Sequence, residues 1–139
     1  MPDQFVILVA DRNRHVREFL GRELSADGYL VLGVKDGREL MAMVHEGPIP
    51  DLIILDLELP YVDGLEVLER IRGLGARVPV VIHTFLTEYA GQPAIREAAA
   101  FVEKSGDSIH RLKATVAEVL RHHSTRSAPP ADAEGGRGG

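Results

Sequence analysis

The feature that most constrains the fold is a regular alternation of short apolar runs with longer segments of helical spacing. Five runs are rich in bulky apolar residues and short enough to form strands. They are FVILVA (5–10), YLVLGV (29–34), LIIL (52–55), VVIH (80–83) and FV (101–102). FVILVA and LIIL contain no polar residue, which is typical of parallel strands covered on both faces. The pattern predicts an α/β fold with a mostly parallel sheet and helices on both faces.

The segments between the runs place apolar residues on one face of a helix. The first of these segments begins at Asn13, a favourable capping residue, and ends at Gly28. A short helix is expected to start near Pro93, since proline suits the first turn. The other predicted helices cover residues 37–47, 64–75 and 107–120.

Composition sets the class of protein. The chain has 139 residues and a net charge of −5, without the basic stripe of a nucleic-acid-binding protein. No apolar run is long enough for a membrane span, and the N-terminus lacks a signal peptide, so a cytoplasmic protein is expected. We expect one domain over residues 1–123 and a disordered tail over residues 124–139, which is small, polar and rich in Pro and Gly.

Polar side chains follow four of the predicted strands. Asp11, Asp56, Thr84 and Lys104 lie at or just past the ends of these runs. Ligands of open parallel sheets bind outside the carboxyl ends of the strands, so these four side chains should meet at one edge. A carboxylate can attack a phosphoryl group, a lysine and a hydroxyl can stabilise its oxygens, and a second carboxylate can hold Mg²⁺. The residues therefore point to phosphoryl chemistry.

The histidines suggest no metal site. His83 should point to the opposite face of its strand from Thr84 and act as a packing residue. His122 and His123 are adjacent in sequence, so they cannot share one helical face, and we expect both to be exposed.

Four segments, in order and at matching spacing, resemble bacterial response-regulator receiver domains, the single-domain chemotaxis type in particular. They are VILVAD (6–11), DLIILDLELPYVDG (51–64), VPVVIHT (78–84) and AFVEK (100–104). Pro60 and Gly64 follow Asp56 by four and eight residues, as in the family's phosphorylation segment. The resemblance runs from about residue 5 to residue 121 and implies a flavodoxin-like, five-stranded parallel sheet of order 2-1-3-4-5.

The resemblance also implies roles in two-component signal transduction. Asp56 would accept a phosphoryl group from a sensor histidine kinase or a phosphotransfer protein, as in a phosphorelay. Thr84 and Lys104 would bind the phosphoryl group, Phe101 would move inward with Thr84, and Asp11 would help to hold Mg²⁺. The chain would be a signalling module rather than an enzyme. It would bind an unknown downstream protein through the surface of its fourth helix, fifth strand and fifth helix. We expect neither nucleic acid nor a membrane as a partner. Whether the chain forms a homodimer is left open.

The chain departs from the family pattern at its metal-binding acid pair. The family carries two adjacent acids after the first strand, and the second binds the metal directly. This chain has Asp11 followed by Arg12. An inward Arg12 would repel a divalent cation by about 8 kcal/mol, which is twice the value for unit charges about 4 Å apart at an effective dielectric of about 20. Mg²⁺ binding should therefore be weak or absent.

Two positions of the Arg12 side chain are open. It could turn to solvent, which would leave Asp11, Asp56 and Glu58, through its backbone or side chain, for a weak metal. It could instead stay inward and pair with Asp56, because a guanidinium matches a carboxylate in two-point contact. We favour the inward ion pair.

Three smaller departures concern the surroundings of the site. Phe85 stands where the family prefers a small residue, so its ring could cover Asp56 or pack outward. Ser105 and Gly106 follow Lys104 where the family has proline, and the segment before the fifth strand looks shortened. Two functions follow: a phosphoacceptor modified on Asp56, or an atypical pseudo-receiver that binds proteins independently of phosphorylation.

Overall fold

The computed structural model describes residues 4–73, 78–85 and 91–127, and strands and helices alternate along them. The strands are β1 (Val6–Ala10), β2 (Leu30–Val34), β3 (Leu52–Leu55), β4 (Val80–Thr84) and β5 (Ala100–Glu103). The helices are α1 (Arg14–Ala26), α2 (Gly37–Glu46), α3 (Gly64–Gly73), α4 (Pro93–Arg96) and α5 (Ser108–Ser127). Each apolar run forms a strand and each segment of helical spacing forms a helix, so the predicted alternation is confirmed.

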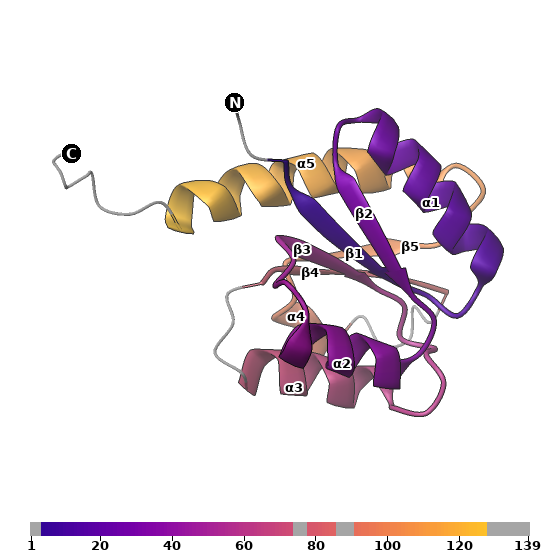
Figure 1. The fold of residues 1–139 in the computed structure, drawn as a ribbon, viewed down its shortest axis with the longest axis vertical. Coiled ribbons are helices and arrows are strands. Elements are labelled where there is room, and N and C mark those ends of the chain that lie inside the picture. Colours follow the sequence, from indigo (N-terminus) through magenta and orange to yellow (C-terminus); the bar gives the residue numbers. More distant parts are fainter. Residues whose placement is uncertain (1–3, 74–77, 86–90, 128–139) are drawn as a thin grey trace, which may run out of the picture.

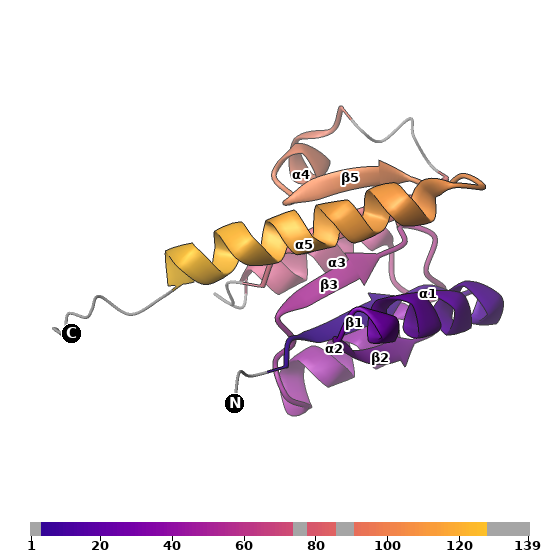
Figure 2. The same cartoon turned by 90° about the horizontal axis from the view of Figure 1, so that it is seen from above.

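The five strands form one parallel sheet of order β2-β1-β3-β4-β5, as predicted. Helices α1 and α5 cover one face, and α2, α3 and α4 cover the other (Figures 1 and 2). The last crossover runs through a single helical turn, α4, which begins at Pro93 as the sequence indicated. All five carboxyl ends therefore lie at the same edge of the sheet.

The two faces of the sheet carry two separate apolar clusters. On one face, Ile7 and Val9 of β1 pack with Leu24 of α1 and Leu112 of α5. On the other face, Leu8 of β1 packs in a cluster with residues of α2, α3 and α4. Strand β3 is buried along its whole length, which explains why LIIL has no polar alternation.

Local signals explain where the helices begin. The Asn13 side chain accepts hydrogen bonds from the backbone N–H groups of His15 and Val16, so it caps α1 as predicted. Asp36 caps α2 by accepting a hydrogen bond from the Glu39 N–H. Gly28, which follows α1, has a φ of 97°, a left-handed conformation that favours glycine.

Helix α5 ends at Ser127, and the rest of the tail predicted over residues 124–139 lies outside the described residues. Within the described ranges, no helix has the length and apolar character required to cross a membrane.

Candidate functional site

Backbone pairing continues one residue beyond the strands and brings three side chains to the carboxyl edge of the sheet. The Asp11 N–H donates to the carbonyl of Val34 at 3.1 Å, and the Asp56 N–H donates to the carbonyl of Ala10 at 2.9 Å. The Lys104 N–H donates to the carbonyl of Thr84 at 2.9 Å. The end of each strand is thus fixed by its neighbour, and the four residues predicted to meet at this edge do meet there.

Lys104 joins the two carboxylates of the site. Its Nζ lies 2.7 Å from Asp11 Oδ2 and 2.7 Å from Asp56 Oδ2, and all three side chains are buried. Burial lowers the pKa of the Lys104 ammonium, but the hydrogen bonds to Asp11 and Asp56 outweigh burial and raise that pKa above its usual value. Lys104 is therefore charged at neutral pH and offsets one of the two buried negative charges.

The other oxygen of Asp56 is held by two neutral donors. The Thr84 hydroxyl donates to Asp56 Oδ1 at 3.1 Å, and the Glu58 backbone N–H donates to the same atom at 3.0 Å. The Asp11 carboxylate receives the Asn13 N–H at 2.8 Å. Both acids are thus fixed in orientation by hydrogen bonds from several elements.

Arg12 does not form the inward ion pair with Asp56 that we favoured. Its guanidinium lies 3.6 Å from Glu58 Oε1, and its side chain is 60% exposed. The expectation was wrong because Lys104 already occupies the charged face of Asp56, while Glu58 offers a half-buried carboxylate nearer to solvent. Glu58, which we predicted as a ligand for a weakly bound metal, therefore forms an ion pair with Arg12.

The two aromatic residues of the site lie in different surroundings. The ring of Phe85 is 65% exposed, so it packs outward, and its centroid lies 5.3 Å from Lys104 Nζ. Phe101 is half-buried on β5 and packs against the cluster that covers the α2–α4 face. Phe85 therefore contacts the cation of the site, a contact that the sequence did not predict.

His83 is a buried titratable residue beside the site whose role the sequence reasoning understated. It is a packing residue, as predicted, but its Nε2 lies 3.5 Å from Ser108 Oγ, and its Nδ1 has no hydrogen-bond partner among the described residues. Burial lowers the pKa of His83 to about 4, with a further lowering by the Lys104 charge and an opposing effect of Asp56. A histidine in the otherwise apolar run VVIH (80–83) was the signal available in the sequence.

The carboxylates at this edge, which are the groups available to hold Mg²⁺, already have cationic partners. The Asp11 and Asp56 carboxylates both bind the Lys104 ammonium, and the Glu58 carboxylate pairs with Arg12. In the part of the chain that the structure describes, no three acidic or histidine residues are grouped so as to hold a metal ion. Lys104 Nζ contacts one oxygen of each acid, so a cation entering the site would share the Asp11 and Asp56 carboxylates with Lys104.

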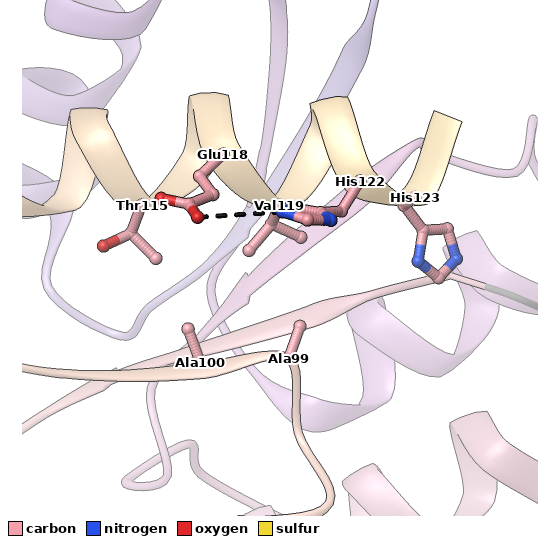
Figure 3. Close-up of a pocket in the computed structure, with 7 residues that line it drawn as sticks. All are labelled: Ala99, Ala100, Thr115, Glu118, Val119, His122 and His123. Carbon is pink, nitrogen blue, oxygen red and sulfur yellow. Dashed lines mark ion pairs between the residues drawn. The ribbon is translucent and has the colours of Figure 1, made fainter. Parts of the chain in front are cut away.

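A hollow of about 430 Å³ lies away from the carboxyl edge of the sheet, between the beginning of β5 and the later turns of α5 (Figure 3). His122 and Glu118 form an ion pair of 3.7 Å along its rim, and Ala99 and Ala100 form its floor. His122 is exposed, as predicted, whereas His123 is half-buried and not exposed. This hollow shares no residue with the Asp56 site.

Comparison with known proteins gives one consistent result. The family model described as "Response regulator receiver domain" matches residues 7–117. Response regulator MprA of Mycolicibacterium vanbaalenii is 42% identical over 78 residues, which are 56% of this chain and 33% of that protein. Response regulator MprA of Mycobacterium avium is 33% identical over 135 residues, which are 92% of this chain and 54% of that protein. The chain thus spans between a third and about half of the length of these curated relatives.

Solved structures agree with the sequence comparison. The response regulator TrrA of Thermotoga maritima, crystallised in complex with Mg²⁺ and BeF, is 31% identical with a TM-score of 0.77 over 84% of this chain and 99% of that chain. The structure of histidine kinase ThkA in complex with TrrA contains a match at 32% identity and a TM-score of 0.76, again over 84% and 99% of the two chains.

Proposed function

Because this chain belongs to the response-regulator receiver family, and is thus a receiver domain of two-component signalling, we propose that Asp56 is its phosphoacceptor. The observation that carries the proposal is the pair of contacts to Asp56, from the Lys104 ammonium at 2.7 Å and from the Thr84 hydroxyl at 3.1 Å. A positive charge and a hydroxyl donor at one buried carboxylate are the groups that stabilise the oxygens of a phosphoryl group.

In the proposed reaction, an Asp56 carboxylate oxygen attacks the phosphorus of a phosphohistidine on a sensor kinase or phosphotransfer protein. The new P–O bond forms as the P–N bond breaks, and the imidazole leaves with its electron pair and takes up a proton. The product is an acyl phosphate on Asp56. Lys104 and Thr84, which bind the carboxylate before transfer, bind the phosphoryl oxygens after it.

We propose that metal assistance is weak at this site. Mg²⁺, when bound, would neutralise charge on the phosphoryl group, and Asp11, Asp56 and Glu58 are the residues that would hold it. The Lys104 bridge and the Arg12–Glu58 pair occupy all three carboxylates, which supports weak binding. Replacing Arg12 with an acid should remove one obstacle.

The output of the domain would be contact between proteins and not catalysis. Thr84 and Phe101 lie on neighbouring strands, with Ile82 opposite Phe101 in the β4–β5 register. A shift of Thr84 toward a phosphoryl group would change the packing of Phe101 and so the surface formed by α4, β5 and α5. A downstream protein would read that change.

The test is modification of Asp56 by acetyl phosphate, followed by intact mass and by release with hydroxylamine, which cleaves acyl phosphates. We expect one phosphoryl group on the wild-type chain and none on Asp56→Asn. Asp107→Asn changes an exposed acid at the same edge and should still be modified. Wild type that stays unmodified with acetyl phosphate and with a panel of phosphorylated kinases, with and without Mg²⁺, would refute the proposal.

The same assay tests the role of Arg12. Adding Mg²⁺ should change the rate of wild-type modification little, whereas Arg12→Asp should make the rate rise with Mg²⁺. Arg14→Gln removes an exposed arginine two residues away and should behave as wild type. Strong Mg²⁺ dependence of the wild type would contradict the weak-metal proposal without affecting the assignment of Asp56.

The pseudo-receiver is the second candidate, and the closed arrangement of charges favours it. Asp56 already has a cationic partner in Lys104 without any ligand, and the Lys104 ammonium lies 5.3 Å from the centroid of the Phe85 ring. A pseudo-receiver would bind its partner equally well as wild type and as Asp56→Asn, and modification of Asp56 by any donor would exclude it.

A further inference from the structure

A hollow of about 550 Å³ lies beside the phosphoacceptor site, and Arg12 is the one lining residue to which the proposed function assigns a role. It is formed by the loop after β1, the beginning of α2 and the loop between β3 and α3. Its lining includes three basic residues, Arg12, Lys35 and Arg38, two acidic residues, Asp36 and Glu39, and the aromatic Tyr61. Its volume is in the range of pockets that bind small organic ligands, which is about 300–1,000 Å³.

The hollow presents a flat aromatic ring. Tyr61 is 72% exposed, and the guanidinium of Arg38 stacks over its ring at 3.7 Å from the centroid. The φ of Tyr61 is 75°, a conformation that costs free energy for any residue other than glycine. The loop therefore holds the Tyr61 backbone in an unfavourable conformation, and the ring it carries is stacked with Arg38.

The loop that carries Tyr61 is attached to α2. The Gly37 N–H donates to the carbonyl of Pro60 at 3.1 Å, and a methyl group at Gly37 would stand 2.5 Å from Val62 Cβ. This close approach places Arg38, the residue after Gly37, beside Tyr61. The Tyr61–Arg38 stack is thus set by backbone contacts and does not depend on a chance position of two surface side chains.

Three basic side chains, Arg12, Lys35 and Arg38, lie around the stack, and the acids Asp36, Glu39 and Glu58 lie among them. Lys35 and Arg12 are 62% and 60% exposed, and their partners Glu39 and Glu58 form ion pairs of 2.6 Å and 3.6 Å with them. Exposed ion pairs contribute little stability, so a phosphate can replace the carboxylates. The guanidinium of Arg38 pairs with no carboxylate of the described residues.

We propose that this hollow binds a nucleoside phosphate, with the base stacked on the Tyr61–Arg38 pair and the phosphates bound by Lys35 and Arg12. Base stacking on an aromatic ring, combined with basic side chains, is how proteins hold nucleotides without reading their sequence. An acidic peptide would use the positive charges but would leave the exposed Tyr61 ring without a role. The nucleotide class therefore accounts for both features of the hollow.

The experiment is isothermal titration calorimetry of the full chain with ATP, GTP and a cyclic dinucleotide. Tripolyphosphate carries charge without a base, and adenosine carries a base without charge. We expect saturable binding with a dissociation constant below about 1 mM for at least one of the three nucleotides, at least tenfold weaker binding of tripolyphosphate and adenosine, and weakening by added salt.

Variants measure separately what the Tyr61 ring and the basic side chains contribute to nucleotide binding. Tyr61→Gly removes the ring and relieves the left-handed backbone, so the chain should stay folded, and nucleotide binding should weaken by about tenfold or more. Lys35→Gln should weaken nucleotide and tripolyphosphate alike. Arg22→Gln is the matched control, because Arg22 also lies over an aromatic ring, 6.0 Å from the centroid of Phe19, but outside the hollow, and it should leave affinity unchanged.

Three outcomes would overturn the inference. The first is the absence of saturable binding by any of the three nucleotides at millimolar concentration. The second is tripolyphosphate or a glutamate-rich peptide binding as tightly as the nucleotides. The third is Tyr61→Gly binding like wild type. None of these outcomes bears on Asp56, since its modification is measured separately.

Discussion

Lys104 is the cationic partner of two buried acids, Asp11 and Asp56. We expect Lys104→Met to lower the free energy of unfolding by about 3 kcal/mol, because Asp11 and Asp56 lose the ammonium that lies 2.7 Å from each. Urea denaturation at pH 7 measures the change. Lys113→Met, which breaks ion pairs on the surface of α5, should cost less than about 1 kcal/mol. Equal effects of the two variants would show that the buried bridge adds nothing to stability.

His83 gives the fold a pH dependence on the acidic side. Its pKa is about 4 in the folded chain, lowered mainly by burial, and 6.5 is the reference value. Between these values the unfolded chain binds more protons than the folded chain, so stability falls as pH falls. The loss is about 3 kcal/mol in all, most of it between pH 6 and 4, and no loss from His83 occurs above pH 7.

Urea midpoints from pH 4.5 to 7.5 measure this dependence. His83→Gln should flatten the slope, and His45→Gln, which changes an exposed histidine, should leave the slope unchanged. A slope that persists in His83→Gln would assign the effect to other groups.

Single residues at the site differ in how far the sequence predicts them. Asp11, Asp56, Thr84 and Lys104 follow strands whose parallel order brings their ends together, so topology alone predicts that they meet. The direction of Arg12 depends on the position of Glu58 in a loop and on the competing Lys104, and neither is encoded in local spacing. That is why the favoured Arg12–Asp56 pair was wrong, while the four strand-end residues were placed correctly.

At the scale of elements, α2 and the loop between β3 and α3 form one packed unit. Gly37→Ala should destabilise the chain by about 1–3 kcal/mol, because the added methyl group would stand 2.5 Å from Val62 Cβ. Gly21→Ala lies in the interior of α1, where a methyl group would have no described atom within 4 Å, and it should stabilise by about 0.5–1 kcal/mol. Thermal unfolding of the two variants distinguishes them, and a shift of the same sign for both would contradict the packing argument.

The elements themselves were predictable because two periodicities dominate the sequence. Apolar runs without alternation gave β1 and β3, and three-to-four spacing gave α1, α2, α3 and α5. The contact of Gly37 with Val62 was not predictable, since a glycine at the start of a helix looks the same whether or not another backbone lies against it. Tyr61 likewise carries no local signal for a left-handed conformation.

At the scale of the whole molecule, the two apolar clusters share one sheet. Leu24→Ala removes a side chain from the α1–α5 cluster, and Leu68→Ala removes one from the α2–α4 cluster. Each should cost about 2–5 kcal/mol, because both leucines are fully buried. Strands β1 and β3 contribute to both clusters, so each variant should still unfold in one transition.

Far-UV circular dichroism and tyrosine fluorescence should give the same midpoint for both variants, and the chain has no tryptophan to complicate the signal. Two separate transitions in either variant would show that the faces fold independently.

Lys104 belongs to the same chain as the two acids, so its ammonium is present at the site at an effective concentration that the solution cannot change. Dilution, dialysis or chelation removes a dissolved cation from its ligands but leaves this one where it is. Any dissolved cation therefore competes with the Lys104 ammonium, which is covalently attached to the chain. The Lys104 N–H is hydrogen-bonded to the Thr84 carbonyl, so the backbone from which this ammonium extends is fixed where β4 and β5 end. The charge at this edge is therefore set first by a residue of the chain itself and only then by the ions outside.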